Sequence, residues 1–189
     1  DGIDQYVTLS TDTSVKIQTF SMSVWVKPTV NTTDPILNNG SATGYGANGV
    51  EIFQNWGSFA YRFNATTANI GSVNLNEWNH ILLCYDGADI KYSVNGAAIT
   101  TATISITIDY TNWTGLYAGT SVLGKLTGFV DDYAFFDNDQ SANAATIYNS
   151  GVPSDLSAMT GLIGYWRMGD GATWVSPGAP LPDSWIVPD

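Results

Sequence analysis

The stretch FSMSVWVKP, residues 20–28, decides the fold class because apolar and polar side chains alternate along it. Side chains of a β-strand point to opposite faces with a period of two, so one face of this strand lies in a core. That face carries four apolar residues, Phe20, Met22, Val24 and Val26. Proline cannot donate a hydrogen bond to a neighbouring strand, so the strand ends at Pro28.

The segments that follow this strand repeat the pattern of short strands and tight turns. Strands are predicted at residues 49–53, 58–63, 81–85, 90–94, 101–108, 115–119, 128–136 and 161–168. QNWG (54–57) predicts a hairpin loop, and Asn95-Gly96 is the strongest hairpin-turn signal in the chain. The one helix expected lies near Ala142–Tyr148, with Ser141 as its cap.

This organisation predicts an all-β protein, namely a two-sheet antiparallel jelly-roll sandwich with one short helix. Residues 1–171 are expected to form this domain. Residues 172–189 are rich in proline and show no alternation, so we expect an irregular C-terminal tail.

Composition and charge exclude several classes of function. The formal net charge is -11, and the six Lys and Arg residues are scattered from Lys16 to Arg167. Nucleic-acid binders need a basic patch, so no nucleic-acid partner is expected. No run approaches the about 18 apolar residues of a membrane span, so no membrane insertion is expected. The single cysteine, Cys84, lies in an apolar run and is expected to be buried and inert.

Five landmarks along the chain resemble the laminin-G-like, concanavalin A-like jelly-roll domains. They are DGIDQYV (1–7), FSMSVWVKP (20–28), NEWNHILLCYDGADIKYSVNG (76–96), GFVDDYAFFDNDQSANAATIYNSG (128–151) and GLIGYWRMGDGA (161–172). The resemblance implies the sandwich fold over most of the chain. The YWRMGDGA variant with its Pro-rich tail is most similar to copies in structural proteins of tailed bacteriophages.

Two adjacent carboxylates, Asp131 and Asp132, interrupt the apolar run of residues 128–136. Three interpretations are open, namely a metal site, a catalytic pair or a solvated strand end. The resemblance implies that Asp131 helps to bind a structural calcium, with oxygens of Asp1 or Gly2 nearby. Calcium takes about six to eight oxygen ligands and would neutralise a carboxylate that is costly to bury alone.

No catalytic residues are assigned from the sequence. Retaining glycoside hydrolysis needs two carboxyl groups about 5 to 5.5 Å apart. The chain has only two glutamates, Glu51 and Glu77, and neighbouring residues of a strand, such as Asp131 and Asp132, diverge. His80 is the only histidine and lies in an apolar run, so a structural role is expected. We therefore expect no enzymatic activity.

The aromatic residues are the remaining candidates for binding. Trp25, Trp56, Tyr45 and Trp113 could stack on a sugar or contact a protein partner, although two-sheet proteins bury many tryptophans in the core. The main hypothesis is a non-catalytic structural, decoration or adhesion module of a larger assembly, such as a phage virion, with other structural proteins of that assembly as partners. The alternative is a carbohydrate-binding module of a secreted bacterial protein, with cell-surface glycans as partners. Both hypotheses place the protein outside the cell or on a virion surface.

Overall fold

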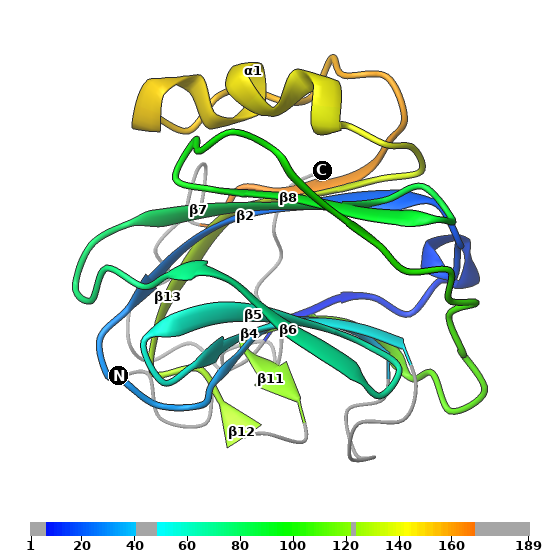
Figure 1. The fold of residues 1–189 in the computed structure, drawn as a ribbon, viewed down its shortest axis with the longest axis horizontal. Helices are drawn as coiled ribbons and strands as arrows, with labels where there is room; N and C mark the ends of the chain where they lie inside the picture. Colours follow the sequence, from blue (N-terminus) through cyan, green and yellow to red (C-terminus); the bar gives the residue numbers. More distant parts are fainter. Residues whose placement is uncertain (1–6, 41–48, 122–123, 169–189) are drawn as a thin grey trace, which may run out of the picture.

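Two antiparallel sheets packed face to face make up the body of the protein, as the computed structural model shows for residues 7–40, 49–121 and 124–168 (Figure 1). Sheet A has the strand order β1 (Val7–Ser10), β10 (Gly115–Ala118), β3 (Pro35–Gly40), β4 (Gly49–Asn55), β5 (Ser58–Phe63) and β6 (Thr66–Ser72). Sheet B has the order β14 (Leu162–Trp166), β13 (Gly128–Phe136), β2 (Phe20–Pro28), β7 (Asn79–Tyr85), β8 (Asp89–Val94) and β9 (Thr100–Thr103). The predicted all-β jelly-roll sandwich is confirmed.

Strand β2 lies at the centre of sheet B, between β13 and β7, and its bounds match the sequence prediction. Its apolar face points into the space between the sheets. The ring of Phe20 stacks on Phe63 of sheet A at 5.8 Å and on Phe135 of β13 at 5.9 Å between ring centroids. Burial of each such side chain contributes about 1.5–3 kcal/mol, so this aromatic layer binds the two sheets together.

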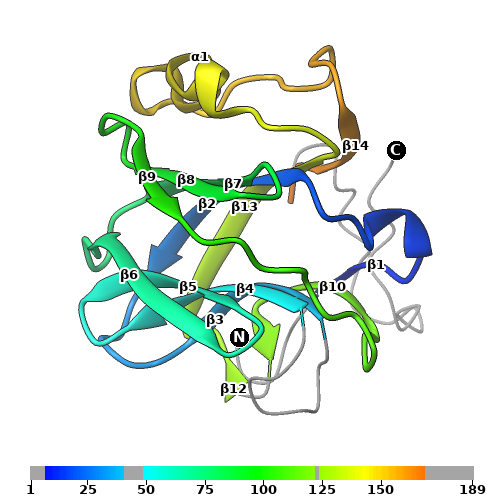
Figure 2. The same ribbon diagram turned by 45° about the vertical axis from the view of Figure 1, so that its right-hand side comes forward.

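A third layer covers the outer face of sheet B (Figure 2). It contains a 3₁₀ turn (Ser141–Asn143), helix α1 (Ala144–Tyr148) and a second 3₁₀ turn (Asn149–Gly151). A second apolar cluster lies under it, formed by Leu82, Cys84, Ala134, Phe136, Ile147 and Leu156. This layer explains why residues 81–85 are apolar on both faces, and the predicted burial of Cys84 is confirmed.

The start of the helical segment differs from the sequence prediction. Ser141 lies inside the first 3₁₀ turn, and its backbone N–H donates to Oδ1 of Asp139 at 2.8 Å. The side chain that receives this N–H is therefore Asp139, and the cap predicted at Ser141 is wrong. The predicted tail, residues 172–189, lies outside the described residues.

The strand predicted at residues 101–108 ends at Thr103. Beyond it, side chains take over the hydrogen bonds that a strand partner would make. The hydroxyl of Tyr85 donates to the carbonyl of Ile106 and accepts from its N–H. The amide of Gln18 likewise binds both the carbonyl and the N–H of Ile108, at 3.0 and 2.8 Å. The apolar face of this segment still packs on the core.

A small ladder of β11 (Thr120–Ser121) and β12 (Gly124–Lys125) lies beneath the outer face of sheet A (Figure 1). A polar row crosses that face at one level, with Asn38 of β3, Glu51 of β4 and Arg62 of β5 side by side. The middle of this row is buried, because Asn38 and Glu51 are only 4% and 5% exposed. Sheet A therefore does not offer an open central face.

Candidate functional site: an exposed aromatic end

Trp25 lies on the outer face of sheet B, as its position in the alternation predicts, but the third layer covers it. The ring of Tyr148 from α1 stacks on the indole at 5.9 Å, with 16° between the ring planes. His80 of the neighbouring strand packs beside it at 5.0 Å, and the tryptophan is only 5% exposed. Trp25 therefore holds α1 on the sheet and has no free ring face for a ligand.

Trp113 lies at the end of sheet A where β3 terminates. Its indole N–H donates to Oδ1 of Asn39 at 2.8 Å, and the ammonium of Lys16 lies 5.5 Å from its ring centroid. The tryptophan is half-buried against the core. Tyr45 lies outside the described residues, as do Asp1 and Gly2.

Trp56 is the candidate that the structure leaves open, since it is 71% exposed. It forms the tip of the β4–β5 hairpin together with Gly57, and both residues have positive φ angles, 44° and 85°. Two such residues make the type I′ turn that joins tightly twisted strands. A bulky residue rarely adopts this left-handed conformation, so the position of Trp56 is unusual.

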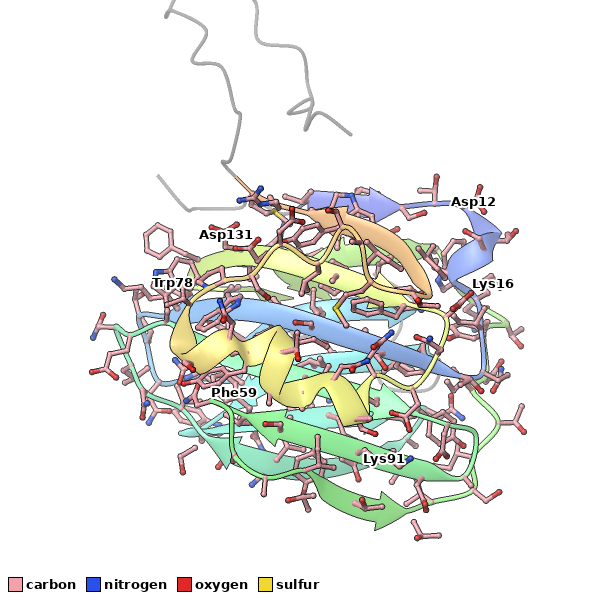
Figure 3. All side chains as sticks on the ribbon, turned by 90° about the horizontal axis from the view of Figure 1, so that it is seen from above. Asp12, Lys16, Phe59, Trp78, Lys91 and Asp131 are labelled. Atoms are coloured by element: carbon pink, nitrogen blue, oxygen red, sulfur yellow. The ribbon has the colours of Figure 1, made fainter. Side chains whose placement is uncertain are left out.

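Five of the large apolar side chains exposed in the described residues lie at the same end of the sandwich, four of them in loops and Phe129 near the start of β13. We call this surface the aromatic end; it consists of Val30, Trp56, Leu75, Trp78 and Phe129. Trp78 is 44% exposed and Phe129 59% exposed. Figure 3 shows Trp78 at one end of the molecule and Lys16, beside Trp113, at the other. The sequence candidates Trp56 and Trp113 are thus separated rather than brought together.

Backbone hydrogen bonds connect the loops of the aromatic end and fix them relative to one another. The pairs, donor first, are Trp56–Thr32 (3.2 Å), Val73–Gly57 (3.0 Å), Asn76–Pro28 (2.8 Å) and Thr29–Thr127 (3.0 Å). The buried side chain of Asn79 braces the loop before β7, since it accepts from the N–H of Asn74 and donates to the carbonyls of Asn74 and Glu77. The exposed rings are therefore carried on fixed backbone.

Strand register places a cation between two of these rings. Lys27 of β2 is opposite Phe129 of β13, and the β2–β7 register pairs Val26 with Asn79. Trp78 directly precedes β7, and continuing this register by one residue sets Lys27 beside it, on the face that points away from the core. Sequence reasoning missed Phe129 and Trp78 as site residues. The available signal was that Phe129 is apolar at an outward-facing position.

The Asp131–Asp132 pair forms a bulge in β13. The N–H of Asp132 donates to Oδ1 of Asp131 at 2.8 Å, and the φ angle of Asp132 is 45°. Asp132 is the more buried of the two, and its Oδ1 accepts from the hydroxyl of Tyr165 at 2.7 Å and lies 3.6 Å from Nε of Arg167. The bulge breaks the simple alternation, so the two carboxylates have different surroundings.

This geometry bears on the predicted calcium. The described residues contain no group of three His, Cys, Asp or Glu side chains that could hold a metal ion. Asp132 already has Tyr165 and Arg167 as partners. Calcium takes about six to eight oxygens, which include backbone carbonyls as well as carboxylates. A calcium shared with Asp1 or Gly2 stays a prediction.

Two titratable groups of the interior, His80 and Glu51, have structural partners. Nε2 of His80 lies 2.9 Å from the hydroxyl of Ser23, and burial lowers the pKa of His80 from its ordinary value of 6.5 to about 4. Burial raises the pKa of Glu51, opposed by a hydrogen bond from Ser121 and by the charge of Arg62. The Glu51 carboxylate accepts from Arg62 at 2.9 Å.

In the described part of the chain, no helix is long and apolar enough to cross a membrane.

Comparison with known proteins places this geometry in a wider context. The concanavalin A-like lectin/glucanases superfamily matches residues 1–147. A protein from Bacteroides ovatus ATCC 8483, provisionally described as carbohydrate-binding, shares the fold with a TM-score of 0.68 at 14% identity, over 90% of this chain and 51% of that one. This chain therefore spans about half the length of that protein. No curated protein matches the sequence.

Two further solved structures share the fold. The CBM40 of the Ruminococcus gnavus IT-sialidase, bound to α2,3-sialyllactose, has a TM-score of 0.59 at 15% identity, over 74% of this chain and 86% of that one. A structure of botulinum neurotoxin type C, described with its dependence on two ganglioside molecules for cell entry, has a TM-score of 0.54 at 15% identity, over 77% and 39% of the two chains. Identities this low show the shared fold alone.

Proposed function

The chain belongs to the concanavalin A-like lectin/glucanases superfamily, and from that premise we propose that it is a non-catalytic carbohydrate-binding module that holds a glycan at its aromatic end. The observation that carries the proposal is the exposure of Trp56 and Trp78 on hydrogen-bonded loops and of Phe129 near the start of β13. The apolar faces of sugar rings stack on aromatic side chains, and neighbouring backbone and Asn or Thr groups bind the hydroxyls.

The other surfaces support the same choice by elimination. Helix α1 and its flanking turns cover Trp25 on the outer face of sheet B. The centre of the outer face of sheet A is buried at Asn38 and Glu51. The aromatic end therefore presents the largest exposed aromatic rings among the described residues.

The solved structures of similar fold also support a carbohydrate ligand. One is a carbohydrate-binding module in complex with sialyllactose, and another is a toxin whose cell entry depends on gangliosides. They favour the carbohydrate-binding hypothesis over the structural module of a phage virion, which stays a prediction without support from these matches. A glycan-binding role fits a location outside the cell or on a surface, with cell-surface glycans as partners.

Absence of catalysis is part of this proposal. Of the two glutamates, Glu51 is buried in an ion pair with Arg62 across sheet A, and Glu77 lies on an exposed loop at the aromatic end. Asp132 is held by Tyr165 in a bulge of β13. This arrangement supports binding rather than the paired, facing carboxyl groups that glycoside hydrolysis requires.

A glycan array tests the proposal. We expect the purified chain to bind a defined set of glycans, and Trp56→Ala and Trp78→Ala to weaken that binding. Ile163→Ala is the matched control, because Ile163 is an exposed apolar residue near the opposite end of β13. Absence of binding across the array, or binding that both tryptophan variants retain in full, would contradict the proposal.

A further inference from the structure

We infer that the aromatic end selects uncharged glycans over sialylated or otherwise acidic ones, an inference that rests on the proposed function and specifies its ligand class. The inference follows from the positions and the partners of the basic side chains. Recognition of a sugar carboxylate relies on charge-assisted hydrogen bonds, most effectively from the planar fork of an arginine. All six Lys and Arg residues of the sequence lie within the described residues.

Both arginines already have carboxylate partners. Nη1 of Arg62 lies 2.9 Å from Oε2 of Glu51, and its guanidinium lies over the ring of Phe53 at 5.0 Å. Nε of Arg167 lies 3.6 Å from Oδ1 of Asp132. Arg62 lies in the middle of sheet A, and Arg167, which directly follows β14, lies beside Asp132 of β13. Both guanidinium groups are therefore already engaged by carboxylates of the protein.

Three of the four lysines are also engaged. Nζ of Lys91 lies 2.8 Å from Asp86 and 2.6 Å from Asp139. Lys16 lies over Trp113 at the opposite end of the molecule (Figure 3). Lys125 also has a partner. These contacts leave Lys27 as the one cation beside the exposed rings of Phe129 and Trp78.

Acidic residues offset Lys27 at the same end. Asp131 follows two residues after Phe129 on the same strand, and Glu77 directly precedes Trp78 on an exposed loop. Lys27 and the Asp132-bound Arg167 therefore stand among three carboxylates, those of Asp131, Asp132 and Glu77. The whole chain carries a net charge of -11, which adds a repulsive field for any anionic ligand. An uncharged glycan meets the same aromatic rings without this repulsion.

The test uses an array of glycan pairs that differ only in a terminal acidic sugar, such as lactose and 3′-sialyllactose. The whole chain is applied at low and at physiological salt. We expect binding to uncharged members, and roughly threefold or more weaker binding to their acidic partners at low salt. The difference should narrow as salt screens the charges.

The outcomes separate this inference from the proposed function. Acidic glycans that bind as tightly as their uncharged partners, or more tightly, would overturn the inference and leave carbohydrate binding in place. Loss of that acidic binding in Lys27→Gln would then identify Lys27 as its anchor. If no pair binds at either salt concentration, both the inference and the proposed function are wrong.

Discussion

Trp56 occupies the first position of a turn in which asparagine is the preferred residue. Its φ of 44° costs a non-glycine residue about 1–2 kcal/mol, yet the side chain makes little contact, being 71% exposed. Strain at an exposed bulky residue is a reason to look for function there. At the scale of single residues, protein stability therefore favours a different residue at position 56, whereas ligand binding favours Trp56.

The substitution Trp56→Asn should therefore stabilise the protein and weaken glycan binding. We expect the free energy of unfolding to rise by about 1 kcal/mol, because asparagine tolerates the left-handed conformation. Glycan affinity should fall roughly three- to tenfold, the equivalent of about 0.5–1.5 kcal/mol of aromatic contact. Urea unfolding and calorimetric titration measure the two effects. Trp56→Tyr is the control and should keep both the backbone strain and most of the glycan affinity. If Trp56→Asn instead loses stability and keeps its glycan affinity, this interpretation is contradicted.

His80 gives the protein a specific dependence on pH. Burial lowers the pKa of the folded state to about 4, against 6.5 in the unfolded chain. Between these values the unfolded chain binds a proton that the folded protein does not, so stability falls as the pH drops below 6.5. At pH 5 the expected loss from this group is about 2 kcal/mol. Urea unfolding of wild type and His80→Gln at pH 7 and pH 5 measures it; an equal loss in both proteins would show that other groups are responsible.

At the scale of elements, the contact between α1 and sheet B depends on a turn far away in the sequence. Gly96, in the turn after β8, has a φ of 71°, and a Cβ there would clash with the ring of Tyr148. Tyr148 in turn stacks on Trp25. The turn therefore needs glycine both for its backbone conformation and for the close approach of α1.

A pair of alanine substitutions separates these two needs. Gly87→Ala introduces strain alone, because Gly87 has a φ of 96° and its nearest neighbour to an added Cβ is Oγ1 of Thr19 at 4.0 Å. Gly96→Ala adds a clash with Tyr148 to a similar strain. We expect about 1–2 kcal/mol of destabilisation from Gly87→Ala and clearly more from Gly96→Ala. Thermal or urea unfolding measures the stability of both variants. An equal loss of stability in the two would contradict this role of Gly96, because α1 would then move away from the added Cβ without an energetic cost.

At the scale of the whole molecule, alternation was sufficient to predict the sandwich, because the apolar face of β2 packs between the sheets, although the helical layer also buries its outer face. The polar segments PILNNG and TTANIGS were not predicted as strands, although they form β3 and β6. Their partners, rather than their own alternation, bring them into sheet A. The end of β9 was also not predictable, since Tyr85 and Gln18 replace its strand partner from distant positions.

The candidate site was predicted only in part. Trp56 follows from the hairpin signal in QNWG, so its exposure could be expected. Trp25 could not be recognised as covered, because α1 reaches it from more than a hundred residues away in the chain. Trp78 and Phe129 come together with Lys27 only through the register of three strands. Such register is set by tertiary packing and is not visible in local patterns.

The location of the bound glycan tests the central claim most directly. The seven tryptophans give seven indole N–H signals in an NMR spectrum of the protein, which can be followed while a glycan selected from the array is added. We predict that the signals of Trp56 and Trp78 shift with the added glycan, while those of the covered Trp25 and the distant Trp113 stay in place. Shifts centred on Trp113 or Trp25, with Trp56 and Trp78 unchanged, would contradict the account.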